Sequence, residues 1–234
     1  MKLKTGTDSS FEIRREHCHS DIVSASVLYL SDLHFKRSSA SIVESLMQTI
    51  TGLNPDIILL GGDYSDSASG TEHLEDLFHF LSQYKNVFAV LGNHDRSGRE
   101  EIACLMENMG IEWIEHGTAY ATVKGQRIAI DGNRISTHAA GSFSILCLHE
   151  PLDLNTFHQD YDLAFAGHLH GSQFVFWRSG EALYPGRLFY RWNILKKISG
   201  RCHYFISKGL GDTLPIRYNC KKDIIFVTIG SQET

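Results

Sequence analysis

The regular pattern of the chain begins with the stretch VLYLSDLH, residues 27–34. Its first four residues are apolar and predict a short buried strand. The run ends at Asp32 and His34, whose side chains are good ligands for divalent metals. A strand that ends in a metal ligand delivers that ligand to one edge of its sheet, so this stretch predicts both a buried strand and part of a metal site.

Four further polar blocks follow, each directly after an apolar run. They are Gly62-Asp63, Gly92-Asn93-His94-Asp95, Leu148-His149-Glu150 and Gly167-His168-Leu169-His170. One such block alone is commonly a turn or a hydrogen-bonded pair, but chance does not explain five in succession at strand ends. Ligands in open α/β sheets collect at the carboxyl ends of the strands, so the five blocks predict a metal site there, and a site for two metals.

The segments between the blocks alternate between strand and helix patterns. Buried strands are expected at 27–31, 56–60 and 86–91, and helices within 41–53, 74–81 and 102–109, with Gly110 just after the last. This alternation predicts a mainly parallel sheet. The second half is richer in strands: a hairpin is expected from 120–123 and 127–131, and further strands at 143–148, 162–166, 173–177, 203–207 and 224–229.

The composition is that of a soluble globular protein, with 234 residues of which 42% are hydrophobic. We expect an N-terminal segment, mobile in part, at residues 1–25 and one domain at residues 26–234. An odd number of cysteines without a Cys-x-x-Cys motif indicates reduced thiols. No export signal or apolar run of roughly 20 residues is present. We therefore expect a cytoplasmic protein, with a peripheral position on a membrane left open.

Taken together, the blocks resemble those of the calcineurin-like dinuclear metallophosphoesterases. The pattern of that family is Asp-x-His, Gly-Asp, Gly-Asn-His-Asp/Glu, a later His and Gly-His-x-His, and residues 32–170 contain all of it. The resemblance implies an α/β fold, a four-layer α/β/β/α sandwich of two mixed sheets. It also implies hydrolysis of a phosphodiester or phosphomonoester by a hydroxide that two divalent metals activate. Mn²⁺ is the expected metal, with Fe and Zn²⁺ as alternatives.

The resemblance assigns a role to each polar residue of the blocks. His94 would be the acid that protonates the leaving oxygen, and Asp95 would orient it. The metal ligands would form two sets bridged by Asp63: Asp32, His34 and His170 for one metal, and Asn93, His149 and His168 for the other.

Three motifs are similar to a bacterial, membrane or cell-surface subgroup of the family. They lie at Leu30–His34, Gly62–Tyr64 and Gly167–Gln173. This subgroup includes the UDP-2,3-diacylglucosamine pyrophosphatase of lipid A synthesis, which is the alternative function. A nuclease or a non-catalytic metal-binding scaffold is the second alternative. For a nuclease we would expect a more basic chain, and for a scaffold we would expect some of the metal ligands to be missing.

Charge is distributed unevenly along the chain. Residues 1–173 contain 12 Lys and Arg against 23 Asp and Glu, whereas residues 174–234 contain 10 against 4. Within the basic part, residues 174–203 combine aromatic and cationic side chains. They are either ordinary core and loop residues or a rim that contacts an amphiphilic phosphate or an anionic membrane. The expected partner is a small phosphate ester or amphiphilic phosphate, and no specific nucleic acid.

Overall fold

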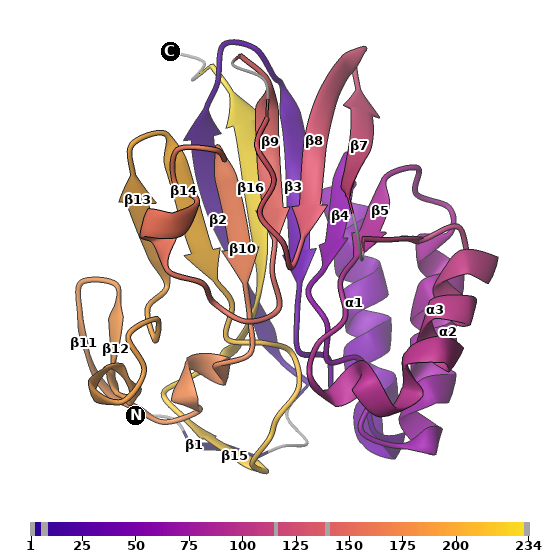
Figure 1. Cartoon of the computed structure of the whole chain (residues 1–234). Helices are drawn as coiled ribbons and strands as arrows, with labels where there is room; N and C mark the ends of the chain where they lie inside the picture. The colour runs from indigo at the N-terminus through magenta and orange to yellow at the C-terminus, as the bar shows by residue number, and fades with distance from the viewer. Residues whose placement is uncertain (1–2, 6–8, 115–116, 139–140, 232–234) are drawn as a thin grey trace.

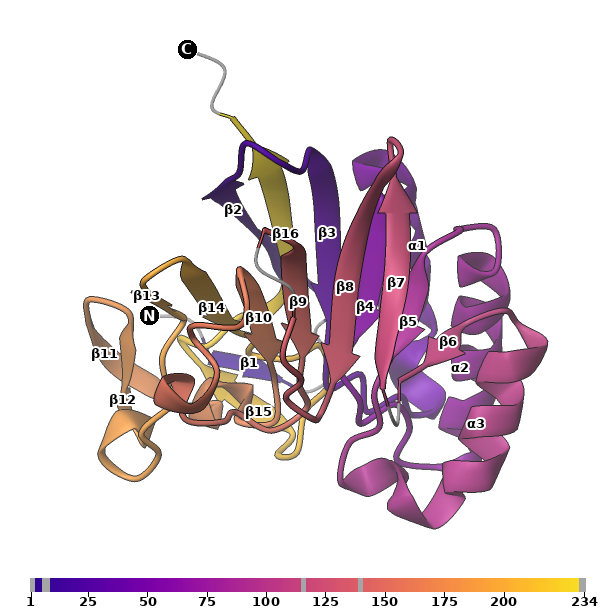
Figure 2. The same ribbon diagram turned by 45° about the horizontal axis from the view of Figure 1, so that its top comes forward.

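Two six-stranded mixed sheets pack face to face in the computed structural model, which describes residues 3–5, 9–114, 117–138 and 141–231 (Figures 1 and 2). The strand order is β2-β16-β3-β4-β5-β6 in the first sheet and β13-β14-β10-β9-β8-β7 in the second. This arrangement confirms the expected α/β class with two mixed sheets.

The first sheet supplies three of the five polar blocks. Strands β3 to β6 run parallel to one another, β16 is antiparallel to β3, and β2 is parallel to β16. Helices α1 (Ala40–Leu53), α2 (Ala68–Leu81) and α3 (Arg99–Asn108) cover its outer face (Figure 1). The strands of this sheet are β2 (Phe11–His19), β3 (Ala25–Leu30), β4 (Ile57–Leu60), β5 (Val87–Ala89), β6 (Glu112–Trp113) and β16 (Lys222–Gly230).

The second sheet supplies the other two blocks. Its strands are β7 (Thr118–Val123), β8 (Gln126–Gly132), β9 (Phe143–Cys147), β10 (Leu163–Ala166), β13 (Lys196–Ser199) and β14 (Cys202–Ile206). The predicted hairpin is β7–β8. A loop containing the 3₁₀ turn η3 (Leu154–Thr156) packs on the outer face, so in the described part of the chain the fourth layer is loop and short turn rather than α-helix.

Two small sheets lie at the lower edge of the molecule in Figure 1. One pairs β11 (Val175–Ser179) with β12 (Ala182–Pro185), and the other pairs β1 (Leu3–Thr5) with β15 (Ile216–Tyr218). The sequence predicted β11 and did not predict β1, β12 or β15.

Strand β2 lies in the segment that the sequence analysis placed outside the domain. It pairs with β16 along its whole length, so the sheet begins before residue 26. Arg14 on β2 also donates to the carbonyls of Leu195 and Ile206, at 2.8 and 2.7 Å. The strand was missed because it lies at a sheet edge and its mostly polar residues show no apolar pattern. Residues 1–2 and 6–8 of that segment lie outside the described residues.

Tyr29 ties the two sheets together across the core. Its ring stacks on Phe165 of β10, with centroids 5.1 Å apart, and its hydroxyl donates to the carbonyl of Leu148 at 2.8 Å. Gly61 makes room for it, because a Cβ there would lie 2.2 Å from the Tyr29 hydroxyl. The contact therefore fixes the end of β9, where the His149 block begins, against β3 and β4.

Among the described residues, no helix is long and apolar enough to cross a bilayer. All five cysteines are free, as their number and spacing predicted.

Replacing Tyr29 by Phe should leave the buried Leu148 carbonyl without its donor. We expect the free energy of unfolding to fall by about 1–3 kcal/mol, the cost of an unsatisfied buried acceptor, as measured by urea denaturation. Tyr120→Phe, at an exposed site on β7, is the control and should change it little. Equal stability of the two variants would contradict this role for Tyr29.

Candidate metal centre

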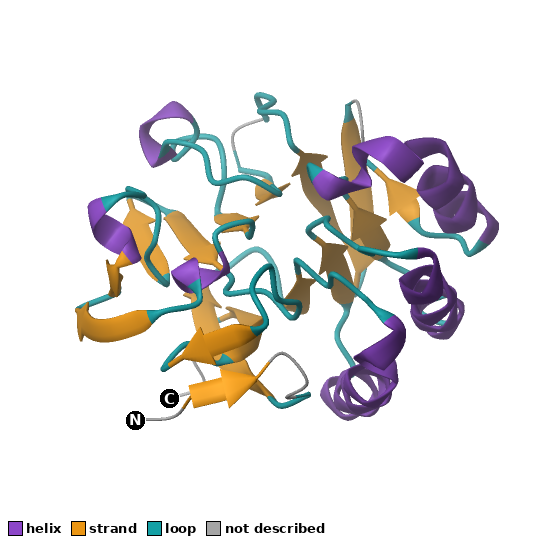
Figure 3. Cartoon of the chain, turned by 90° about the horizontal axis from the view of Figure 1, so that it is seen from below, coloured by secondary structure: helices purple, strands orange, loops and turns teal. Residues whose placement is uncertain are grey.

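All five polar blocks meet at one edge of the two sheets. Asp32 and His34 follow β3, Asp63 follows β4, Asn93 follows β5, His149 follows β9, and His168 and His170 follow β10. Figure 3 looks onto this edge, where loops from both sheets converge. Five separate strand ends therefore position the predicted ligands, as expected from parallel strands that begin from the same side.

Five of these seven residues have a left-handed backbone. The φ angles are 52° at Asp32, 42° at His34, 55° at Asp63, 69° at His168 and 49° at His170. This region is sparsely populated by residues other than glycine and costs free energy. Its repetition at the ligands shows that the loops are bent to aim side chains at one place, a feature that no sequence pattern revealed.

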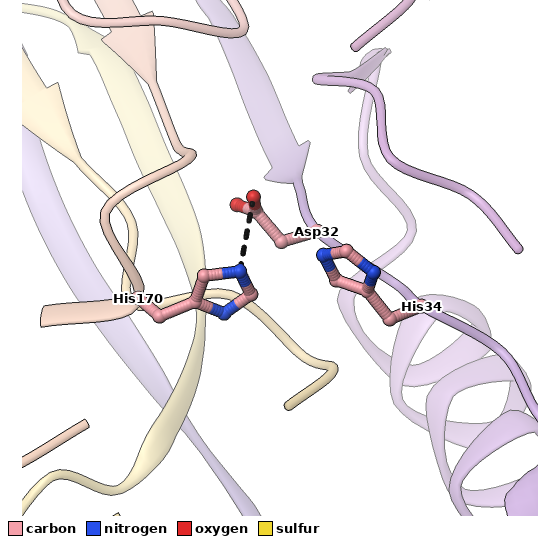
Figure 4. A group of neighbouring side chains, drawn as sticks. All are labelled: Asp32, His34 and His170. Atoms are coloured by element: carbon pink, nitrogen blue, oxygen red, sulfur yellow. Dashed lines mark ion pairs between the residues drawn. The ribbon is translucent and has the colours of Figure 1, made fainter. Parts of the chain in front are cut away.

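The first cluster joins Asp32, His34 and His170 (Figure 4), which are all buried. One ligand atom from each lies within 4.8 Å of the other two, and His170 Nε2 is 3.6 Å from Asp32 Oδ1. His34 Nε2 is buried and has no hydrogen-bond partner among the described residues. A buried, unpartnered imidazole nitrogen beside two other ligand atoms fits a metal ligand.

The second cluster joins Asp63, His149 and His168, with Asn93 beside them. His149 Nε2 is 2.9 Å from Asn93 Oδ1, 3.4 Å from Asp63 Oδ2 and 3.2 Å from His168 Nδ1. Four potential ligand atoms thus converge on one point. The residues predicted for the second metal, Asn93, His149 and His168, thus lie together with Asp63, while the roles of these residues stay predictions.

Asp63 lies between the two clusters. Its Oδ2 is 3.5 Å from His34 Nε2 of the first cluster and 3.4 Å from His149 Nε2 of the second. Burial raises the pKa of this carboxyl, but the hydrogen bond and charge of His149 outweigh it and hold the pKa at about 2. Asp63 is therefore a carboxylate at neutral pH and is placed to bridge two cations.

Hydrogen bonds behind the histidines turn Nε2 toward the clusters. His34 Nδ1 is 2.6 Å from Asp66 Oδ1, and His149 Nδ1 is 2.8 Å from the carbonyl of Gly61. When each Nδ1 donates its proton to these oxygens, Nε2 has a free lone pair for a metal. Asp66 was not among the predicted site residues, although it lies only three positions after Asp63.

The structure places Asp95 differently from its predicted role. Both of its carboxylate oxygens accept backbone N–H groups, from Asp63 and Gly92 at 2.7 Å and from Tyr64 at 2.9 Å. Asp95 thus holds the loops after β4 and β5 together. The acid recorded beside the His94 ring is Asp66, 4.0 Å from His94 Nδ1.

A C-terminal loop supports the first cluster from behind. Gly211 donates to the carbonyl of Asp32, and a Cβ at Gly209 would lie 2.8 Å from the Asp32 Cβ. The buried carboxylate of Asp223 anchors this loop by accepting from the Lys208 backbone at 2.7 Å and the Ser207 hydroxyl at 2.9 Å. This support joins residues nearly 200 positions apart, so only the folded chain shows it.

Three pockets have a residue of the clusters in their lining, and one of them, of about 330 Å³, is lined by Leu33, His34 and Gly211. A pocket of about 850 Å³ is lined by His34, Asp66 and His94 and extends along α2 and α3. A second, of about 490 Å³, is lined by Asn93 and His149, together with Arg96, Arg99, Arg134 and Trp113. Residues of both clusters therefore line cavities.

Comparison with known proteins gives a consistent picture. A family model described as calcineurin-like phosphoesterase matches residues 25–172. The phosphodiesterase YaeI of Escherichia coli is 26% identical over 220 residues, which cover 87% of this chain and 81% of that protein. A putative metallophosphoesterase of Caenorhabditis elegans, F40B5.2, is 24% identical over 194 residues, 70% of this chain and 40% of that one.

Among solved structures, the sulfate thiohydrolase SoxB of Thermus thermophilus has a TM-score of 0.49 and 12% sequence identity to this chain. The likeness covers 88% of this chain and 56% of that protein, so the chain spans little more than half of SoxB.

Replacing Asp63 by Ala should remove the carboxylate that faces both clusters. We expect the purified protein, reloaded with Mn²⁺, to lose at least one of two bound metals per chain, as measured by elemental analysis after desalting. Asp76→Ala, at an exposed site on α2, is the control and should keep the metal content. Full metal content in the Asp63 variant would contradict a bridging position.

Proposed function

The chain belongs to the calcineurin-like phosphoesterase family, and on this premise we propose that it hydrolyses phosphodiesters at the two clusters bridged by Asp63. That it is a hydrolase acting on phosphoesters follows from the family. The preference for a diester over a monoester is the proposal. It is supported by the phosphodiesterase that is similar over most of both chains.

The observation behind this preference is that the two larger pockets are lined by different residues of the site, His34 and His94 in one and Asn93 and His149 in the other. A phosphodiester has two organic substituents, and a monoester has one. With the phosphorus at the cluster, the larger pocket beside His34 and His94 would hold one substituent, and the smaller pocket beside Asn93 and His149 would hold the other. A monoester would leave one of the two pockets without a substituent.

The residues present fit two divalent cations, because three buried histidines, two carboxylates, an amide oxygen and the half-buried His168 converge there. Two bound cations would neutralise phosphate charge and lower the pKa of a water molecule so that hydroxide forms near neutral pH. The N/O ligand set suits Mn²⁺, Fe or Zn²⁺, and Mn²⁺ stays a prediction.

His94 would act as the acid for the leaving oxygen. Its side chain is about half exposed, lines the larger pocket and lies beside His34, with ring centroids 5.0 Å apart. Asp66 faces its Nδ1, so Nε2 is the nitrogen left to give a proton to the departing alkoxide. In this arrangement Asp66, rather than Asp95, would orient the acid.

Three alternative functions were considered from the sequence: a pyrophosphatase, a scaffold and a nuclease. A UDP-2,3-diacylglucosamine pyrophosphatase gains no support from the family match or from the relatives above, and it stays a prediction. A scaffold without activity is disfavoured, because the seven predicted ligands lie together at one edge. For a nuclease, the acidic balance of residues 1–173 around the centre is unfavourable.

The proposal is tested with bis-p-nitrophenyl phosphate and p-nitrophenyl phosphate as matched diester and monoester. Metal-stripped protein reloaded with Mn²⁺ should have a higher kcat/KM for the diester, and Asn93→Ala should remove turnover of both. His94→Ala should retain bound metal and lower kcat by about 10²–10⁴-fold, the usual contribution of a general acid.

A clear preference for the monoester would contradict the diesterase proposal while leaving the family assignment intact. Loss of metal in the His94 variant would instead contradict its role as an acid outside the ligand sets.

The arginines of the smaller pocket predict a preference for an anionic substituent. Neither Arg96 nor Arg134 has an ion pair with a described residue, and both line the pocket that contains Asn93 and His149. The double variant Arg96→Ala/Arg134→Ala should therefore lower kcat/KM for a pyrophosphate diester by about tenfold or more, since one charge-assisted hydrogen bond contributes about 1.5–3 kcal/mol.

Turnover of bis-p-nitrophenyl phosphate, whose substituents are uncharged, should change far less in that variant. Arg127→Ala, at an exposed arginine that packs over Tyr120 on the β7–β8 hairpin, is the control. Equal losses for both substrates would contradict the charge preference.

A further inference from the structure

A short segment after the metal ligands exposes an unusual set of apolar side chains. We call residues 175–190, which comprise β11, β12 and the 3₁₀ turn η5 (Gly186–Leu188) with the two residues after it, the projecting hairpin. It extends away from the two large sheets at the lower edge of the molecule (Figures 1 and 2). Its exposed residues are Phe176 at 60%, Trp177 at 51%, Leu188 at 68%, Phe189 at 78% and Tyr190 at 55%.

This concentration is not the ordinary scatter of apolar residues over a protein surface. Among the described residues, twelve large hydrophobic side chains are exposed, and eight of them lie between Phe176 and Ile216. Gln173 joins the hairpin to the neighbouring loop, because its side chain bonds to the backbone of Leu214 and Ile216, which are also exposed. The base of the hairpin is thus tied to the loop that exposes Leu214 and Ile216.

Hydrogen bonds hold the projecting hairpin in a defined conformation. The N–H groups of Phe189 and Tyr190 both donate to the carbonyl of Gly186, at 3.0 and 2.9 Å. The buried side chain of Asn193 donates to the carbonyl of Leu183 at 2.8 Å and closes the turn. Because these bonds hold the apolar side chains outward, docking would cost little ordering entropy.

The charge around these side chains is opposite to that of the rest of the protein. Residues 174–203 contain six Lys and Arg and one acidic residue, Glu181, whereas the whole chain has a net charge of −5. Arg178 and Arg187 lie within the projecting hairpin, and Arg191 follows it directly. Exposed aromatic and aliphatic side chains flanked by cations are the chemistry that binds an anionic lipid surface.

We propose that the projecting hairpin docks on an anionic lipid bilayer, with Leu188, Phe189 and Tyr190 entering the interface and the flanking arginines contacting lipid phosphates. Aromatic side chains with polar ends favour the headgroup region, and arginine can keep its charge at that level. A second copy of this chain is the other possible occupant, but a two-fold contact through the hairpin would bring the arginines of the two copies together.

Docking in this way would bring the metal centre close to the bilayer. The hairpin follows His170 and the turn η4 (His170–Ser172) almost directly, and a Cβ at Gly186 would meet the Ser172 hydroxyl at 2.1 Å. In Figure 1, β10, which ends just before His168, points toward the lower edge at which β11 and β12 lie. A phosphoester anchored in the membrane would then meet the centre without leaving the bilayer.

The test is co-sedimentation of the full chain with vesicles, which does not depend on activity. The protein should bind vesicles that contain phosphatidylglycerol and not vesicles of phosphatidylcholine alone, and binding should weaken as salt rises above about 0.1 M, where surface charges become screened. The double variant Leu188→Ser/Phe189→Ser should bind at least tenfold more weakly. Arg178→Gln/Arg187→Gln should also bind more weakly.

The matched control is Ile22→Ser/Tyr120→Ser, which removes two half-exposed apolar side chains away from the hairpin and should leave binding unchanged. Circular dichroism verifies that each variant is folded. Equal binding by the Leu188/Phe189 variant, or no binding of the unchanged protein to anionic vesicles, would overturn the proposal. A dimer that dissociates in this variant, seen by analytical ultracentrifugation without lipid, would overturn it in favour of a second copy.

Discussion

The carboxylate of Asp63 faces two imidazole nitrogens from opposite sides, His34 Nε2 at 3.5 Å and His149 Nε2 at 3.4 Å. His34 and Asp63 belong to the first sheet and His149 to the second, so the contact exists only when both sheets are packed. Burial of the carboxylate opposes its charge, and the surrounding histidines offset that cost. Two bound cations would offset the buried charge of Asp63 further. The centre would then link the two sheets as well as being the proposed site of chemistry.

Much of the surrounding structure serves to hold this edge in place. Asp95 joins the loops after β4 and β5, Tyr29 fixes the end of β9 against β3, and Asp223 anchors the loop behind Asp32. Such support is needed because the ligand loops adopt left-handed backbone conformations that are unfavourable by themselves. The stability of the core therefore compensates for the unfavourable backbone of these loops, as is common where several side chains must converge on one point.

The proposed functions depend on the pockets and on the projecting hairpin that lie next to the metal centre. Two pockets extend from the ligand cluster, one toward the helices and one lined by arginines, and they favour a substrate with two substituents. Beyond His170 the chain forms an exposed apolar and basic hairpin instead of returning to the core. Catalysis and membrane docking would thus share one edge of the molecule.

The sequence alone predicted the residues that meet at the metal centre, and it determined the strands that end in them and the three helices, because apolar periodicity and the chemistry of the polar blocks are local properties. It missed β2, because an edge strand of mostly polar residues shows no such period. The family resemblance implied that Asp95 orients His94, whereas in the structure the Asp95 carboxylate accepts backbone N–H groups from the loops after β4 and β5. Only the tertiary structure placed Asp66 beside His94, since their contact requires the loops after β4 and β5 to meet. The same holds for the pockets, the left-handed ligand loops and the exposure of the projecting hairpin, which depend on packing between distant segments and not on any local pattern.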